Sequence, residues 1–278
     1  MRHSASGMSV AGLCAAFVLV CGSALSAEQA KIPDLSGTFA HNISHFWPPE
    51  SGPGPVTNMP GLPHLYGQDA GKGLPGTRLW IGDPTSSILK PWAANAVRTR
   101  AAEEIGREES PWQPLQLCEL VGTPHVLLLR EPVFLLQEAK MVTMIYQRDQ
   151  QTRRVYLGEQ HPKDLAPTPY GHSVGRYDGD TLVIDTVGMT AEGMIDYFGT
   201  PATEAMHVIE RYRLIDNGQT LEVRFTVEDP ATFTTPWSGI QRYRRVRADN
   251  WEEVRCAENP KDSDGSEYPI PKDDWPDF

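Results

Sequence analysis

The sequence has little cysteine and lacks the common motifs of metal-binding and nucleotide-binding proteins. Its four cysteines form no Cys-x-x-Cys pair and have no close histidine partner, so a zinc site is not predicted. No Gly-x-Gly-x-x-Gly segment lies between an expected strand and an expected helix, and the phosphate-binding pattern Gly-x-x-x-x-Gly-Lys-Ser/Thr is absent. Nucleotide cofactors are therefore not supported, and we predict neither a cofactor nor a metal.

Positive charge is also in the minority. The chain has 25 Lys and Arg against 36 Asp and Glu, a formal net charge of −11. Because an acidic surface repels nucleic acid and anionic membranes, neither is predicted as a partner. Beyond the N-terminus no apolar run approaches the roughly 20 residues that a membrane-spanning helix requires. The 24 glycines and 24 prolines indicate many turns rather than long helices.

The N-terminus has the layout of a secretory signal peptide. Arg2 precedes an apolar run over residues 8–20, and small residues follow it. This order predicts cleavage near residues 24–27, a leader over residues 1–26 and a periplasmic or secreted protein. A buried N-terminal helix is the alternative.

Cleavage would leave Cys118 and Cys256 as the cysteines of the exported chain. In an oxidising compartment these two can form one disulfide. Two separate buried thiols remain an equal alternative.

Residues 27–116 are expected to form an N-terminal arm and a helix packed on the main domain. The first part is rich in Gly and Pro and has little periodic pattern, so we expect an extended arm anchored by Phe46, Trp47 and Tyr66. Good helix formers after a proline predict a helix over residues 91–108.

His41 and His45 in the arm have the i, i+4 spacing of two metal ligands on one helical face. Pro48 and Pro49 would end such a helix almost at once, and no third ligand is near. A metal site is therefore not predicted.

From Cys118 onward, short runs with strand patterns alternate with turns. We predict strands near residues 124–130, 132–138, 140–147, 152–158, 170–177, 181–187, 206–214, 220–228, 238–247 and 251–255. Strands at this spacing without helical crossovers predict an all-β domain, an antiparallel meander that closes into a lipocalin-like (calycin-like) barrel over residues 117–258 or folds into a sandwich. Residues 259–278 are expected to be a surface-bound or loose tail.

Two hairpins give the clearest strand and turn pattern. Asp178-Gly179 predicts a type I′ turn, and Asp216-Asn217-Gly218 predicts a second tight connection. Counting outward from the first turn places His172 opposite Asp185. Directly opposed residues have side chains on one face, so we predict contact between them.

Polar residues gather in and beside these hairpins. Folding does not obviously require six of them, namely His172, Asp185, Asp196, Tyr197, His207 and Glu210. The cluster comprises His161, His172, Asp185, Asp196, Tyr197, His207, Glu210 and Tyr212. Histidine exchanges protons near neutral pH and a carboxylate can orient it. The catalytic hypothesis makes His172 the base, Asp185 its orienting partner and Tyr197 or Glu210 the acid. The alternative is structural: hydrogen bonds at a barrel rim, with Glu210 paired to Arg176 or Arg224.

Several segments along the chain carry a resemblance to a known family. They are Leu89-Lys-Pro-Trp-Ala-Ala-Asn-Ala-Val97, Cys118 with Gly122-Thr-Pro124, Tyr156 with His161-Pro162, Gly171-His-Ser-Val-Gly-Arg-Tyr-Asp-Gly-Asp-Thr-Leu-Val-Ile-Asp-Thr-Val-Gly188, Asp196, Gly199-Thr-Pro201, Ile209-Glu-Arg-Tyr212, Glu228-Asp-Pro230 and Trp237. With these segments the chain resembles a functionally uncharacterised family of exported all-β proteins that is abundant in environmental bacteria. The resemblance implies a secreted all-β domain and brings no settled activity. Where relatives often have Pro-His-Ser-Glu, this chain has Pro201-Ala-Thr-Glu204.

These observations lead to two functional hypotheses. The first is an exported small-molecule enzyme, a lyase, isomerase or hydrolase, that uses acid-base chemistry on a hydrophobic or aromatic compound bound in the barrel mouth. The second is a non-catalytic periplasmic binding protein for such a compound. Trp47, Trp80, Trp237 and Tyr197 are the aromatic candidates for contacting it in either case.

Overall fold

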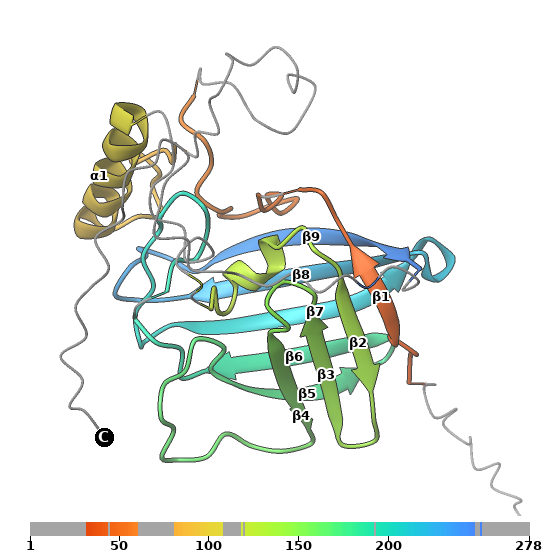
Figure 1. Cartoon of the computed structure of the whole chain (residues 1–278). Helices are drawn as coiled ribbons and strands as arrows, with labels where there is room; N and C mark the ends of the chain where they lie inside the picture. Colours follow the sequence, from red (N-terminus) through yellow and green to blue (C-terminus); the bar gives the residue numbers. More distant parts are fainter. Residues whose placement is uncertain are drawn as a thin grey trace, which may run out of the picture. The chain divides into compact units, whose positions relative to one another are not determined.

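A computed structural model describes residues 32–43, 45–60, 81–107, 118, 120–191, 193–247 and 251. Its strands form a closed barrel in which neighbours follow the order of the chain (Figure 1). The strands are β1 (Gly37–Ala40), β2 (Val133–Gln137), β3 (Met141–Tyr146), β4 (Thr152–Leu157), β5 (His172–Asp178), β6 (Thr181–Val187), β7 (His207–Ile215), β8 (Thr220–Glu228) and β9 (Trp237–Val246). The all-β barrel with one α-helix is confirmed.

The barrel departs from a pure antiparallel meander at one place. β4 and β5 pair in parallel, with Val155 opposite Ser173, while all other neighbouring strands are antiparallel. A parallel pair cannot be joined by a tight turn. The connection over residues 158–171 therefore crosses back along the barrel, and it brings His161 beside the start of β5.

β1 closes the barrel and was not predicted. It belongs to the arm and pairs with β2 on one side and β9 on the other. The strand has only four residues, too few for an alternating pattern to be recognised in a segment rich in Gly and Pro. Its Phe39 is buried in the interior, so the arm contributes to the barrel instead of only crossing it.

Alternation along the strands divides their side chains between two environments. In β8 the apolar side chains of Leu221, Val223, Phe225 and Val227 are buried in the barrel interior. The intervening residues face outward, as predicted for a strand with one wet face. The same period of two on β5, β6 and β7 places chemically different side chains on the inner and outer faces of the same strands.

Aromatic side chains fill one end of the barrel. The Phe46 and Phe225 rings pack edge to face with centroids 4.6 Å apart, and both Phe225 and Phe233 lie 5.7 Å from Trp237. Phe46 is thus the predicted anchor of the arm, whereas Trp47 is exposed, so the prediction for Trp47 is wrong. Trp237 is a core residue in this packing and does not line an open mouth. Tyr66 and Trp80 lie outside the described residues.

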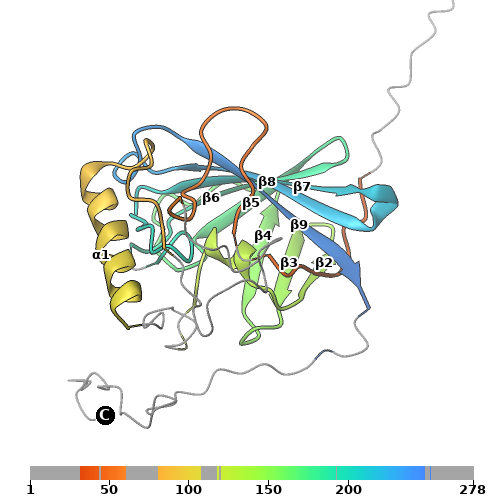
Figure 2. The same cartoon turned by 90° about the horizontal axis from the view of Figure 1, so that it is seen from above.

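The helix α1 (Pro91–Arg107) agrees with the prediction within one residue and lies outside the barrel at one end (Figures 1 and 2). Ala93, Val97 and Ala101 are buried, and this i, i+4 spacing forms the packed stripe. The indole of Trp92 donates a hydrogen bond of 2.7 Å to the carbonyl oxygen of Ala231. The helix therefore covers the loops beyond β6 and β8.

Two predicted strands differ in the structure. The expected strand at residues 124–130 is a 3-10 helix, η2 (His125–Leu128), with all four side chains buried; a short apolar run of this kind fits a buried helical turn as well as a strand. In β2, Val133 and Leu135 are buried, whereas Leu136 is exposed. Trp251 is not in a strand, and the rest of the last predicted strand lies outside the described residues.

Cys118 is disulfide-bonded, which confirms that this thiol is oxidised; its predicted partner Cys256, the signal peptide and the C-terminal tail lie outside the described residues. No helix among the described residues is both long and apolar enough to span a membrane.

Candidate active site

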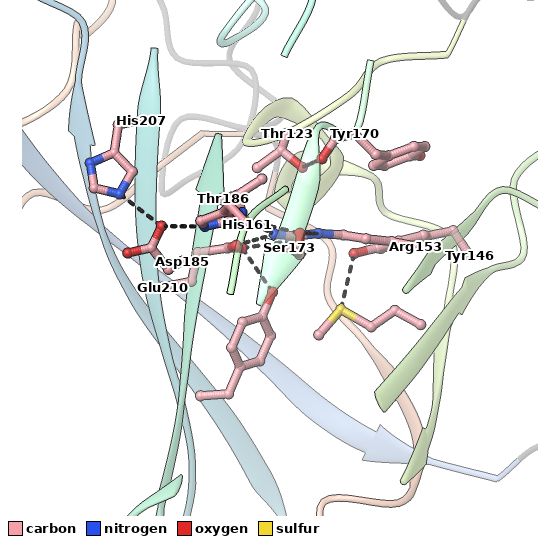
Figure 3. A network of polar contacts seen from close by, with 12 residues as sticks. Thr123, Tyr146, Arg153, His161, Tyr170, Ser173, Asp185, Thr186, His207 and Glu210 are labelled. Atoms are coloured by element: carbon pink, nitrogen blue, oxygen red, sulfur yellow. Dashed lines mark hydrogen bonds and ion pairs between the residues drawn. The ribbon is translucent and has the colours of Figure 1, made fainter. Parts of the chain in front are cut away.

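Two polar clusters occupy opposite faces of the same strands (Figure 3). On the outer wall, His161, His172, Asp185 and His207 form a chain of hydrogen bonds. Inside the barrel, a second network is centred on Arg153. The alternation of β5 and β6 separates them, because His172 and Asp185 each stand next to an inward-facing neighbour, Ser173 and Thr186 respectively.

The outer chain is organised around one carboxylate oxygen. Asp185 Oδ1 lies 3.0 Å from His161 Nε2 and 3.0 Å from His207 Nε2, as the dashed lines of Figure 3 show. His161 continues the chain, since its Nδ1 is 2.9 Å from His172 Nδ1. At the other end His207 Nδ1 is 3.5 Å from Glu228 Oε2. The His161, Asp185 and His207 side chains are 23–33% exposed, so solvent and solutes reach this site.

These contacts determine how the protons are distributed. The Asp185 carboxylate accepts hydrogen bonds, so His161 donates from Nε2 and, when neutral, has an unprotonated Nδ1. His172 must then donate from its own Nδ1 to His161. The Nε2 atom of His172 is left with a free lone pair, which is the form of histidine that acts as a general base.

The surroundings of His172 favour its neutral form. Burial lowers the pKa of the imidazole below its usual value of 6.5, and nearby His161 lowers it further, while Glu159 opposes the shift. The ring also stacks on Tyr156 of β4, with centroids 5.2 Å apart and planes 12° from parallel. A neutral base is therefore held in a fixed orientation beside an aromatic ring.

The loop that supplies His161 is fixed at its end by the backbone. Thr168 N donates to the carbonyl oxygen of Gly188, and Gly171 N donates to that of Thr168, both at 3.0 Å. Gly171 has φ +62, and a Cβ there would lie 2.5 Å from the carbonyl oxygen of Val187. Only glycine fits this close approach, and His172 follows directly.

The inner network is a buried ion pair with a hydroxyl shell. Arg153 Nη1 donates to Glu210 Oε1 at 2.9 Å, and its Nη2 also contacts Oε2 of the same carboxylate. The two side chains are 1% and 0% exposed. Arg153 further donates to Ser173 Oγ at 3.2 Å and to Thr186 Oγ1 at 2.9 Å. Tyr212 donates its hydroxyl to Glu210 Oε1 at 3.0 Å.

Burial sets the protonation of this inner network. It raises the pKa of the Tyr212 hydroxyl, and the charge of Glu210 raises it further. Burial alone would lower the pKa of the Arg153 guanidinium, but the Glu210 carboxylate raises it overall. The tyrosine thus stays a neutral donor and the arginine stays charged, which suits a structural pair.

Ser173 lies in the segment Gly171-His-Ser-Val-Gly175, which matches the Gly-x-Ser-x-Gly pattern of a hydrolase nucleophile elbow. Our sequence-based interpretation overlooked this match. In the structure Ser173 lies within a strand, is 1% exposed and is bonded to Arg153 and Thr186. It has neither the strand-turn-helix setting nor the access to solvent that a nucleophile elbow requires.

Asp196 and Tyr197 lie in a different part of the molecule. Asp196 Oδ1 accepts hydrogen bonds from the Phe198 and Thr200 amides, and Oδ2 accepts one of 2.7 Å from the Thr200 hydroxyl. Burial raises its pKa to about 6. The Tyr197 ring packs edge to face on His125, 4.6 Å between centroids. Asp196 therefore fastens a loop, and Tyr197 packs on the core.

The predicted residues thus separate into three places. His161, His172, Asp185 and His207 come together on the outer wall, Glu210 and Tyr212 face the interior, and Asp196 and Tyr197 belong to the loop before β7. Glu210 pairs with Arg153 and not with the expected Arg176 or Arg224. Three contributors were not predicted, namely Tyr156, Arg153 and Glu228. Glu228 had a usable signal, because it is an acid at the end of the predicted strand that becomes β8.

The predicted register across the first hairpin is wrong by two residues. His172 stands opposite Val187, and Asp185 stands opposite Val174. The reason is the turn: Asp178 and Thr181 pair, so Gly179 and Asp180 form the loop, and only Gly179 has a positive φ. This is the pattern of a type II′ turn. A shift of two residues keeps the side chains of His172 and Asp185 on the same face of the sheet. The two residues are then diagonal neighbours, and His161 lies between them and contacts both.

Among the described residues, no group of three or more His, Cys, Asp or Glu side chains is arranged to hold a metal ion. His41 packs on Tyr243 and His45 on Trp47, so the two arm histidines do not share a ligand site. No protein-family model and no curated protein sequence matches the chain.

Proposed function

We propose that this protein is an enzyme that moves a proton to or from a hydrophobic or aromatic small molecule, with His172 as the general base. The observation that carries the proposal is the chain from Asp185 through His161 to His172, with 3.0 and 2.9 Å contacts. The site lies on the outer wall and not in the barrel mouth, where aromatic side chains are packed.

The chain can relay charge during the reaction. When His172 Nε2 takes a proton from the substrate, its Nδ1 proton passes to His161 Nδ1. His161 then becomes the imidazolium, and its Nε2 hydrogen stays on the Asp185 carboxylate. The positive charge thus forms 3.0 Å from a negative one, which stabilises the intermediate state.

The surroundings favour proton transfer over nucleophilic attack. The hydrogen-bond partners that the structure shows for these histidines are imidazoles and carboxylates, and the nearby Ser173 hydroxyl faces the interior. Tyr156 offers a flat apolar ring beside the base, which suits a planar or aromatic substrate. An isomerase or a lyase that starts by removing an acidic C–H proton fits this set best.

Solvent exchange tests the proposal without knowledge of the product. Hydrophobic and aromatic ketones and esters are incubated with the full chain in D2O, and loss of their acidic C–H signals is followed by NMR. We expect exchange with wild type and a loss of about 10²-fold or more with His172→Gln. His207→Gln is the matched control, since this histidine shares Asp185 but does not contact His172, and its loss should stay below about tenfold.

The pH profile adds a second criterion. Because the pKa of His172 is lowered, the exchange rate should rise with pH and level off around an apparent value below 6.5. Equal exchange by wild type and His172→Gln, across the panel and across pH, would remove His172 from any mechanism.

A binding role without turnover is the second candidate, and a pocket favours it. A pocket of about 320 Å³ is lined by Pro33, Gln137, Leu157 and Tyr177 among others. The Tyr177 hydroxyl is buried and has no hydrogen-bond partner among the described residues. A small molecule with an apolar body and one acceptor would fit it.

Calorimetric titration with the same compounds tests this role. Tyr177→Phe should weaken binding while leaving the exchange reaction unaffected, and Leu157→Trp should block the pocket. Binding that survives both substitutions is not at this pocket.

A further inference from the structure

The outer face of β7, β8 and β9 gathers arginines on a protein that is acidic overall. The outward side chains of Arg211, Arg213, Arg224, Arg242 and Arg244 lie on these strands, and with Trp47 of the arm they make up what we call the arginine face. The face shares no residue with the histidine site.

The strand register arranges this face in rows. Arg211 is directly opposite Arg224, which is opposite Ile240, and Ile240 pairs with Trp47 through two backbone hydrogen bonds of 3.0 and 2.9 Å. The next row runs from Arg213 through Glu222 to Arg242. Since opposed residues share a face, the Trp47 indole lies at the end of the first row.

Carboxylates of the chain offset part of this charge. Like charges directly opposite each other destabilise a sheet, and Asp178, 2.7 Å from Arg211, and Glu50, 3.2 Å from Arg224, relieve the opposed pair. Together with Glu222 they are the three carboxylates that contact arginines of this face in the described part of the chain. Five guanidinium groups against three carboxylates leave a positive excess on a chain whose net charge is −11, and this excess points to an external anion.

One buried carboxylate holds the arginines in position. Glu222 is 4% exposed, and it binds Arg224 Nε at 2.8 Å and Arg242 at 2.9 and 2.7 Å, with Arg213 at 3.7 Å. The arginines above it remain 42–46% exposed. Arg224 also uses its Nη2, which donates to Glu50 at 3.2 Å. Arg242 is held by Glu222 and remains 46% exposed, so its other N–H groups form a planar donor that is already oriented for a second carboxylate.

Trp47 adds a different kind of contact. Its side chain is 42% exposed, and the ring is held edge to face against His45 at 4.8 Å. A flat, exposed indole offers the apolar surface on which the C–H face of a sugar ring packs. From Arg211 to Trp47 the first row crosses three strand spacings, about 14 Å, the length of a few linked sugars.

We propose that the arginine face binds an acidic polysaccharide whose sugars carry carboxylates. Guanidinium groups pair with the carboxylates, and Trp47 stacks on a sugar ring. Nucleic acid and anionic lipid surfaces fit less well, because either would bring a broad negative surface against the acidic remainder of the protein. A flexible polysaccharide contacts only the narrow arginine face.

The test measures binding of polygalacturonate to the full chain by calorimetry, with neutral dextran as the comparison polymer. We expect binding to polygalacturonate that weakens as salt is raised, and none to dextran. Arg211→Gln combined with Arg244→Gln should lower affinity by about tenfold. Trp47→Ala should lower it by roughly tenfold as well.

Controls make the test specific. Arg211 and Arg244 are chosen because Arg224 and Arg242 neutralise buried Glu222, and melting curves verify that each variant is folded. Arg154→Gln removes one positive charge from the outer face of distant β4 and should leave affinity unchanged. Absence of polygalacturonate binding overturns the proposal. An equal loss with Arg154→Gln, or equally tight binding to duplex DNA or phosphatidylglycerol vesicles, overturns it too. None of these outcomes bears on the exchange reaction at His172.

Discussion

Arg153 and Glu210 form an ion pair that the barrel excludes from water, with side chains 1% and 0% exposed. The hydroxyls of Ser173, Thr186 and Tyr212 complete its hydrogen bonds. Removing one partner leaves the other charge buried without compensation. We expect Arg153→Met and Glu210→Gln each to lower the free energy of unfolding by about 3–5 kcal/mol, measured by urea denaturation.

The double variant Arg153→Met with Glu210→Leu separates pairing from packing. It leaves no lone charge, so its cost should be well below the sum of the single costs. Single costs under about 1 kcal/mol, typical of an exposed ion pair, would show that water reaches this network.

Asp196 makes stability depend on pH in an unusual direction. Burial raises its pKa to about 6 from 3.8, so between these values the folded protein binds a proton that the unfolded chain has lost. Binding of this proton adds about 3 kcal/mol to the free energy of unfolding. The added stability is complete below pH 3.8 and is lost as pH rises through 6. Asp196→Asn, which keeps the shape without the charge, should therefore gain stability relative to wild type between pH 4 and pH 7. Urea denaturation at several pH values gives the difference in unfolding free energy between Asp196→Asn and wild type. If this difference stays constant from pH 4 to pH 7, the raised pKa of Asp196 is contradicted.

At the scale of elements, the start of β5 depends on one glycine. Gly171 and Gly179 both have φ +62, but a Cβ on Gly171 meets the carbonyl oxygen of Val187 at 2.5 Å, whereas nothing lies within 4 Å at Gly179. Gly179→Ala should cost about 1–2 kcal/mol, the price of the left-handed backbone. Gly171→Ala should cost more and should also displace His172, slowing the exchange reaction. Equal unfolding free energies for the two variants, measured by urea denaturation, would contradict this account.

The sequence predicted the elements whose signals are local. Alternation over β8 and the turn residues Asp216, Asn217 and Gly218 are enough to place the second hairpin, and all three turn residues do have positive φ. The first hairpin was also found, but its register was not, because Asp-Gly and Gly-Asp both satisfy a two-residue turn. A Gly-Asp turn in place of an Asp-Gly turn shifts every residue pair between β5 and β6 by two residues. The turn therefore decides which residue of β5 stands opposite Asp185.

Elements that depend on distant contacts could not be predicted. β1 is too short to show a period, and it becomes a strand only because β2 and β9 pair with it. Val126, Leu127 and Leu128 of η2 are consecutive apolar residues, so hydrophobic period alone does not separate helix from strand. His161 was recognised as a candidate, but its bridging role required the parallel pairing of β4 and β5, which folds the loop back.

For the molecule as a whole, the barrel wall separates two kinds of chemistry. The interior consists of apolar side chains around one satisfied ion pair, while the outer wall presents the histidine chain and the arginine face side by side along β7. His207 and Arg211 stand four residues apart on that strand's outer face, about 13 Å. The two proposed sites therefore lie on the outer face of one strand.

Acid stability is a property of the whole fold, because it reflects the histidines that folding buries. His125 is fully buried; burial lowers its pKa to about 4, although its hydrogen bond to the Met194 carbonyl oxygen opposes the shift. Between pH 6.5 and 4 the unfolded chain binds a proton that the folded chain does not. The free energy of unfolding therefore falls by about 3 kcal/mol for this residue as pH drops through this window. The effect of Asp196 has the opposite sign, since its stabilisation is lost as pH rises.

Comparison of unfolding free energies at pH 7 and pH 4 isolates the His125 contribution. His125→Gln keeps a donor for the Met194 carbonyl oxygen and cannot take up the proton, so it should lose less stability than wild type on acidification. His207→Gln removes a histidine from the outer wall and should leave the His125 contribution to the acid loss in place. If the His125→Gln variant loses as much stability as wild type, the His125 imidazole is not what limits folding in acid. Other groups must then account for the loss, among them His41, whose pKa burial also lowers to about 4.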